Sequence, residues 1–93
     1  RRLKMNDDLK TCAAVKEHLE FNGVWFDKVN HNKGYKNAFT ARKTYTKYDW
    51  YRPIRLTAEL IKIAIPGVKI IETMEIWDKK YEIIIHKIVF QLL

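Results

Sequence analysis

The last stretch of the chain constrains the fold most, because it is apolar on both of its faces. It reads YEIIIHKIVFQLL, and residues 83–85 and 88–90 are consecutive apolar positions. Successive side chains of a strand point to opposite faces, so such a run needs cover on both sides. We therefore expect residues 81–93 to form a strand inside a sheet rather than at its edge.

The remaining patterns predict two helices and three further strands. Asn6 is a suitable N-cap for the first helix and Gly23 a suitable stop, whereas Pro53 ends a strand and Thr57 caps the second helix. The expected elements are a helix over 7–22, a strand over 24–29, a loop over 30–37, a strand over 38–51, a helix from Thr57 to Ile65, a strand over 68–76 and a hairpin loop over 77–80. The fold class that follows is α+β: a single small domain with a mostly antiparallel sheet of about four strands and two helices, in the order α-β-β-α-β-β.

The length of 93 residues suits one domain, which we place at residues 5–93. Residues 1–4 precede Met5 and are interpreted as an upstream extension or a remnant of expression. No apolar run approaches the ~20 residues that span a bilayer, and no signal-peptide pattern is visible, so we expect no membrane association and a cytoplasmic or otherwise intracellular protein. The single cysteine, Cys12, excludes an internal disulfide and a zinc ribbon.

Charge is unevenly distributed along the chain. Residues 28–55 hold eight Lys and Arg against one acid, Asp49, which gives +7 and equals the formal charge of the whole chain. The remainder is neutral, with ten residues of each sign. If the basic side chains share a face, that face attracts polyanions, and nucleic acid is the first candidate.

The same segment interleaves aromatic and basic residues, a mixture typical of proteins that bind unpaired nucleic acid. Cations follow the phosphates while aromatic rings stack on bases. We predict a non-enzymatic RNA- or DNA-binding module whose contacts come from Lys33, Tyr35, Lys36, Arg42, Lys43, Lys47, Tyr48, Trp50, Arg52 and Arg55. Tyrosines at 45, 48 and 51 cannot all point inward on one strand, so part of this aromatic surface should be exposed.

Three alternatives stay open at this point. The rings could belong to the core and the lysines to a solvated face, with codon bias behind the lysine excess. The basic face could dock on an acidic protein, as in a small interaction or inhibitor module. A metal-independent endoribonuclease could use His31 as general base beside cations such as Arg42.

Metal and cofactor chemistry has little support in the sequence. His18, His31, His86 and Cys12 are scattered without zinc-motif spacing, and no phosphate-cradling glycine loop or dinucleotide fingerprint occurs, so we expect no cofactor and no metal. The acids near the last hairpin are interpreted as structural, with Glu72 at a strand edge or paired with a lysine such as Lys62.

Two expectations concern the last strand itself. His86, flanked by Ile85 and Lys87, is interpreted as a sheet histidine with satisfied hydrogen bonds, because its strand is expected to be buried. The apolar end of the chain, with Phe90, Leu92 and Leu93, suggests a homodimer in which this strand pairs across a two-fold axis.

Overall fold

A computed structural model describes residues 9–93, which form two helices and four strands. In chain order these are α2 (Cys12–Phe21), β1 (Lys28–His31), β2 (Ala38–Tyr45), α3 (Ile54–Ala64), β3 (Lys69–Asp78) and β4 (Ile83–Gln91). The strands form one antiparallel sheet in the order β1-β2-β4-β3. The predicted α+β fold and its element order are confirmed.

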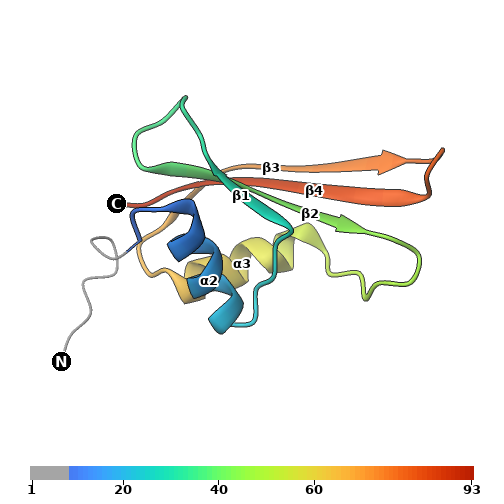
Figure 1. The fold of residues 1–93 in the computed structure, drawn as a ribbon, viewed down its shortest axis with the longest axis horizontal. Helices are drawn as coiled ribbons and strands as arrows, with labels where there is room; N and C mark the ends of the chain where they lie inside the picture. The colour runs from blue at the N-terminus through green and yellow to red at the C-terminus, as the bar shows by residue number, and fades with distance from the viewer. Residues whose placement is uncertain (1–8) are drawn as a thin grey trace.

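The domain has two layers, with α2 and α3 packed on one face of the sheet (Figure 1). None of the described helices covers the other face, which we call the open face. The β3–β4 hairpin extends past the helices to one end of the molecule (Figure 1). One end of the sheet is therefore covered on one side, and the hairpin end projects.

The core lies between the helices and the covered face of the sheet. Val15 and Leu19 of α2 and Ile61 of α3 are fully buried against it. From the sheet, Phe39 of β2 and Phe90 of β4 stack with ring centroids 5.9 Å apart. These contacts explain why β4 must be central: its apolar residues meet the helices while β2 and β3 flank it.

The position of β4 contradicts the strand pairing that was predicted for a homodimer, while the homodimer itself stays a prediction. Both edges of β4 are already paired, with β2 and with β3, so this strand cannot pair across a two-fold axis. Within the described residues, the strands at the two edges of the sheet are β1 and β3.

The first helix starts later than predicted. Thr11 is its N-cap, and the Thr11 hydroxyl accepts a hydrogen bond of 3.0 Å from the backbone N–H of Ala14. Residues 9–11 are not helical. The predicted cap Asn6 and the possible extension 1–4 lie outside the described residues. The C-terminal stop is confirmed, because Gly23 has φ +82°, a conformation that favours glycine.

The strand predicted over 38–51 ends at Tyr45, because Asp49 folds the next residues into a turn. The Asp49 carboxylate accepts hydrogen bonds from the Thr46 backbone N–H at 2.7 Å and the Thr46 hydroxyl at 2.9 Å. Such local bonds compete with a strand ladder. Residues 46–53 therefore form a loop, here called the aromatic loop. Pro53, expected to end a strand, is the N-cap residue of α3, and Thr57 lies inside the helix.

The strand predicted over 24–29 begins only at Lys28, and Val24 and Phe26 are buried in the core ahead of it. The last hairpin also differs in position. Its turn covers 79–82 rather than 77–80, because the Asp78 carboxylate accepts hydrogen bonds from the backbone N–H groups of Lys80 and Tyr81 at 3.0 and 3.2 Å.

A β-bulge changes which face the residues of β3 occupy. Ile70 pairs with Phe90 but Glu72 pairs with Val89, so the register shifts by one residue between them. A one-residue shift moves the following side chains to the opposite face. Ile70 therefore faces the helices, whereas Met74 and Ile76, which strict alternation along the strand would put on the same face as Ile70, lie on the open face with Glu72.

No helix within residues 9–93 combines the length and the apolar character needed to span a lipid bilayer.

Candidate nucleic-acid interface

Strand β2 divides the basic segment between the two faces of the sheet. Ala41 pairs with Ile88, both fully buried on the helix side, so its neighbour Arg42 points to the open face. Lys43 then points back to the helix side. Arg42 and Lys43 are adjacent in the sequence and both belong to the predicted contact residues. They lie on opposite faces of the sheet.

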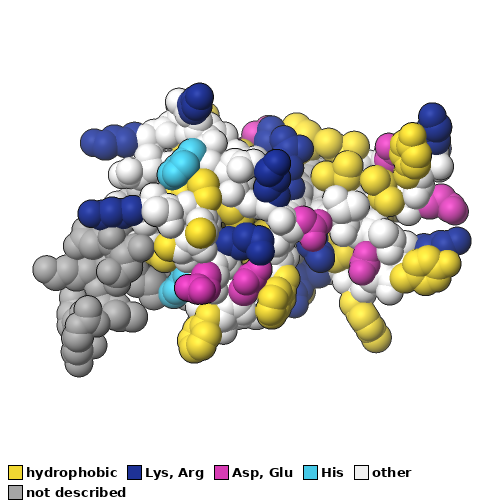
Figure 2. Space-filling view, viewed as in Figure 1, with side chains coloured by type: hydrophobic (Ala, Val, Ile, Leu, Met, Phe, Trp, Pro, Cys, Tyr) yellow, Lys and Arg dark blue, Asp and Glu magenta, His cyan; other side chains and the backbone are white. Residues whose placement is uncertain are grey.

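The open face brings three cations into a line across three strands. Lys28 of β1 lies directly opposite Arg42 of β2, and Arg42 lies directly opposite Lys87 of β4. We call these three residues the cation row. Neighbouring strands are about 4.8 Å apart, so the three Cα atoms span roughly 10 Å. Figure 2 shows Lys and Arg side chains gathered over the middle of the sheet, with hydrophobic side chains beside them along the β3–β4 hairpin.

The cation row has little charge compensation within the described part of the chain. The Lys87 ammonium lies 3.9 Å from the Glu72 carboxylate, while the ion pairs of residues 9–93 include neither Lys28 nor Arg42. Like charges directly opposite each other destabilise a sheet. The sheet therefore carries an electrostatic cost at this position.

Further cations lie at one end of the open face. Lys69 is exposed and lies opposite Gln91, and the Gln91 amide donates a hydrogen bond of 2.8 Å to the backbone carbonyl of Lys36. This bond fastens the 32–37 loop to β4. Lys33, Tyr35 and Lys36 are exposed on that loop.

The other predicted basic residues belong to the helix side or to the aromatic loop. The Lys43 ammonium lies 3.6 Å from the Asp27 carboxylate and 5.6 Å from the centre of the Tyr45 ring. Arg52 donates a hydrogen bond of 3.4 Å to the carbonyl of Gly23. Arg55 is exposed on α3. These three side chains are not part of the open face.

Two of the three predicted aromatic residues, Tyr48 and Trp50, lie in the aromatic loop and not on the open face. Tyr48 and Trp50 are 85% and 96% exposed, and the Lys47 ammonium lies 5.4 Å from the centre of the Tyr48 ring. Tyr45 is buried and Tyr51 half exposed, so the three tyrosines do differ in exposure. The hydrogen bonds from the backbone and side chain of Thr46 lower the pKa of Asp49. The Asp49 carboxylate that holds the turn therefore stays ionised.

Glu75 of β3 is the centre of a hydrogen-bond network that sequence reasoning missed. One carboxylate oxygen accepts from the Tyr51 hydroxyl at 2.5 Å and lies 2.9 Å from Nε2 of His86. The other oxygen accepts from the Trp77 indole N–H at 2.6 Å. We call Glu75, Tyr51, Trp77 and His86 the Glu75 network; it joins the aromatic loop to β3 and β4.

The Glu75 network changes the acidity of its members. The hydrogen bond from Tyr51, with those from Trp77 and His86, lowers the pKa of Glu75 to about 2. The same bond, seen from the hydroxyl, raises the pKa of Tyr51 to about 12. Each shift favours the state present in the network, an ionised carboxylate beside a neutral phenol.

His86 is 1% exposed and packs edge-on against the rings of Tyr45 and Tyr51 at 5.1 and 5.5 Å. Its Nε2 is hydrogen bonded, but its buried Nδ1 has no partner within the described residues. The expectation of a fully satisfied sheet histidine therefore holds for one of the two ring nitrogens.

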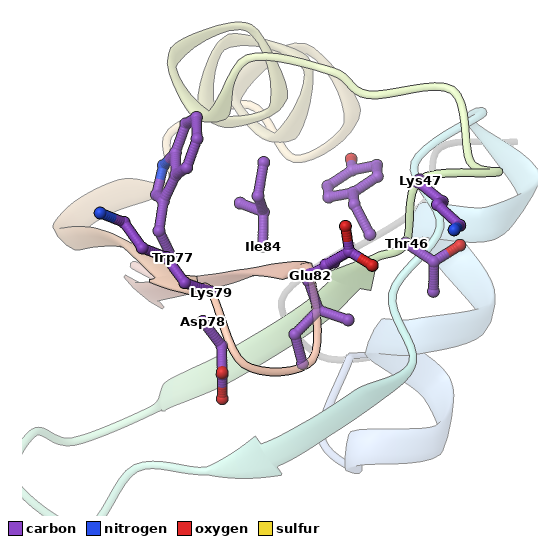
Figure 3. Close-up of a pocket in the computed structure, with 9 residues that line it drawn as sticks. Thr46, Lys47, Trp77, Asp78, Lys79, Glu82 and Ile84 are labelled. Carbon is purple, nitrogen blue, oxygen red and sulfur yellow. The ribbon is translucent and has the colours of Figure 1, made fainter.

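A cavity of about 430 Å³ opens between the aromatic loop and the tip of the β3–β4 hairpin. Figure 3 shows Trp77 at one side of it, Thr46 and Lys47 at the other, and Ile84 and Glu82 between them. Tyr45, Lys79, Asp78 and Ile83 complete the lining.

The other candidate residues form no reactive group. Lys62 is 3.0 Å from Glu59, so Glu72 does not pair with it but with Lys87. His31 follows the buried Val29 by two residues and stacks on Phe39 at 4.9 Å, on the side of the sheet opposite Arg42. Among residues 9–93, no three His, Cys, Asp or Glu side chains are arranged to hold a metal ion.

Comparison with protein-family models, curated proteins and solved structures gave no match at a significant level.

Proposed function

We propose that this protein is a nucleic-acid-binding module that contacts the phosphate backbone with the open face of its sheet. The observation that carries the proposal is the cation row, in which Lys28, Arg42 and Lys87 lie directly opposite one another on three adjacent strands.

The cation row has an electrostatic cost in the free protein. A row of like charges destabilises the free protein, and a polyanion that binds across the row removes the repulsion. Phosphates supply such a ligand, because they present repeated negative charges at close spacing. Lys36 and Lys69 at one end of the open face extend the positive surface beyond the row.

Salt dependence gives the first quantitative test. If five cations contact phosphates, the logarithm of the affinity for a single strand should fall with the logarithm of salt concentration at a slope near −3.5. A flat salt response would exclude binding through the phosphate backbone.

A matched pair of triple variants locates the contacts. We expect Lys28→Ala, Arg42→Ala and Lys87→Ala together to reduce the slope by about 2 units and to weaken binding of all sequences alike. The control combines Lys10→Ala, Arg55→Ala and Lys62→Ala, which removes the same charge from exposed positions outside the open face. Equal losses in both variants would mean that net charge, and not the row, attracts the ligand.

The two alternatives make different predictions in the same assay. A module that docks on an acidic protein would bind polyglutamate but no oligonucleotide. An endoribonuclease that uses His31 and Arg42 has weaker support, because these side chains project from opposite faces of the sheet and cannot act on one phosphate. It would cleave a labelled RNA, and His31→Ala would abolish the cleavage.

A further inference from the structure

The two edges of the sheet differ in length and in protection. Strand β1 has four residues, whereas β3 has ten, and within residues 9–93 no strand pairs with the outer edge of β3 (Figure 1). Proteins protect such edges with short strands, prolines or bulges. Strand β3 contains no proline, and its bulge lies near its start, between Ile70 and Glu72. From Glu72 to Asp78 the outer edge of β3 is therefore regular and open to pairing.

Apolar side chains accompany this edge on the open face. Met74 and Ile76 of β3 are 38% and 41% exposed, and the half-buried Ile85 lies opposite Ile76 on β4. Figure 2 shows hydrophobic side chains along the β3–β4 hairpin. A long strand edge with exposed apolar side chains is typical of a strand that pairs with another chain. The outer edge of β3 thus has the features of an interaction surface.

The acids of β3 restrict how another strand can align with it. Each of them already has a partner in its own chain: Glu72 lies 3.9 Å from Lys87, Glu75 belongs to the Glu75 network, and Asp78 accepts hydrogen bonds in the hairpin turn. Two carboxylates directly opposite each other would nevertheless destabilise a ladder. A favourable register keeps these acids apart.

We propose that the outer edge of β3 pairs antiparallel with the same edge of a second copy of this chain, across a two-fold axis at Met74. With the open faces of both copies on one side of the joined sheet, directly opposite residues point to the same face. The axis places the two Met74 residues opposite each other and Glu72 opposite the partner's Ile76. No acid then lies directly opposite an acid, and Met74 and Ile76 of both copies form one apolar cluster.

Other positions of the axis are less favourable. An axis at Glu75 places the two Glu75 carboxylates directly opposite each other, which destabilises the ladder. An axis at Thr73 brings the bulges of both copies closer to the centre of the ladder. An axis at Ile76 leaves fewer residues in the ladder, because β3 ends at Asp78. Met74 is the position that avoids all three disadvantages.

A second copy suits this edge better than an unrelated peptide, because the pairing closes. The joined sheet has the strand order β1-β2-β4-β3 followed by its reverse, so both of its outer edges are the short β1. A contact that uses the same surface of both copies ends at two chains. A bound peptide would present a new open edge of its own. The fold therefore favours a closed dimer.

The pairing also joins the two cation rows. Met74 lies directly opposite Lys87 on β4, so the axis continues the line of Lys28, Arg42 and Lys87. In the dimer the two rows lie in one line across the joined sheet, about 34 Å long at about 4.8 Å per strand. The use of this line for phosphate binding rests on the proposed function, whereas the pairing itself does not.

The main experiment measures the mass of the protein by light scattering over a range of concentrations. We expect twice the 11.2 kDa of one chain. Met74→Lys places two ammonium groups at the axis and should raise the dissociation constant of the dimer at least about tenfold. Ile63→Lys is the control, because it adds the same charge at a side chain of α3 that is 74% exposed. A single-chain mass at every concentration, or a dimer unaffected by Met74→Lys, would overturn the inference.

A cross-linking experiment tests the register without weakening the contact by charge. In a Cys12→Ala background, Met74→Cys places two thiols at the axis, where opposite Cα atoms are about 4.5–5.5 Å apart and a disulfide can form. Ile76→Cys is the control on the same face, since its two copies are about 14 Å apart and beyond reach. Under mild oxidation Met74→Cys should form a covalent dimer much faster than Ile76→Cys. Equal rates would contradict the axis at Met74.

These measurements separate the pairing from the proposed function when oligonucleotide binding is measured on the same samples. A dimer that binds no oligonucleotide would support the pairing and reject the proposed function. A monomer that binds oligonucleotides would reject the pairing and leave the proposed function intact.

Discussion

The two ends of the sheet are held together by different kinds of interaction. Where the helices cover it, side chains such as Phe39, Phe90 and Ile61 pack in an apolar core. At the projecting hairpin, the aromatic loop is joined to the sheet through the four members of the Glu75 network. Apolar packing is non-directional and supplies most of the stability, whereas hydrogen bonds fix the orientation of particular groups. The covered end thus builds the fold, and the hairpin end positions exposed aromatic side chains.

The largest expected effect is at the covered end. Phe90→Ala should lower the free energy of unfolding by about 3–5 kcal/mol, because Phe90 is fully buried and stacked on Phe39. The measurement is chemical denaturation followed by circular dichroism. Trp50→Ala is the control, since this ring is 96% exposed and should change stability by less than about 0.5 kcal/mol. Similar losses in the two variants would contradict the placement of the core.

A smaller effect is expected for the Glu75 network. Glu75→Ala leaves the buried His86 without its hydrogen-bond partner, so we expect a loss of about 1–3 kcal/mol. Glu72→Ala removes a carboxylate from the same strand, whose ion pair with Lys87 is long, and it should cost less than about 0.5 kcal/mol. When both variants also carry Trp25→Phe and Trp50→Phe, the fluorescence anisotropy of Trp77 should fall in the first variant and not in the second.

The pH dependence of stability should reveal the same network. The pKa of Glu75 is lowered from 4.5 to about 2, so its contribution is fully present above pH 4.5 and is lost as the pH falls toward 2. The difference in unfolding free energy between the unmodified protein and Glu75→Gln should therefore shrink between pH 5 and pH 2. A difference that stays constant over this range would mean that the carboxylate is not specifically hydrogen bonded.

The smallest effect is predicted for the open face, and it has the opposite sign. Arg42→Thr removes the central charge of the cation row and places a β-branched residue in the strand, so stability should rise by about 0.2–1 kcal/mol while oligonucleotide affinity falls. Thermal unfolding and filter binding check the two parts. Lys43→Thr, which loses its contact with Asp27 on the other face, should not be stabilised. A loss of stability in Arg42→Thr would show that repulsion among the three cations of the row does not destabilise the sheet.

Much of the fold could be predicted from the sequence, and the reasons are local. The apolar run of β4 required a central strand, and the Gly23 position required a left-handed conformation at the end of α2. Element boundaries were less predictable. The aromatic and Thr-rich stretch after Tyr45 resembles a strand, but the hydrogen bonds of Asp49 convert it into a loop.

The candidate site was predictable only in part. The sequence showed that the middle of the chain is basic, and it pointed to Arg42. It did not show that Lys28 and Lys87, 59 positions apart, flank Arg42, because cross-strand register depends on how hairpins from different parts of the chain align. The one available signal was the charged Lys87, which with His86 separates two apolar triplets, residues 83–85 and 88–90. Similarly, Glu75 and His86 are polar residues in two different strands, and only their pairing shows why they are there.

The amino-acid sequence by itself determined the class of this domain, its central strand and its overall positive charge, since these follow from composition and from the period of apolar residues. Tertiary structure decided which cations share a face and which ring is held beside the cavity. The physical reason is that side-chain direction alternates along a strand and reverses at a single bulge, whereas neighbours across the sheet are set by long-range pairing.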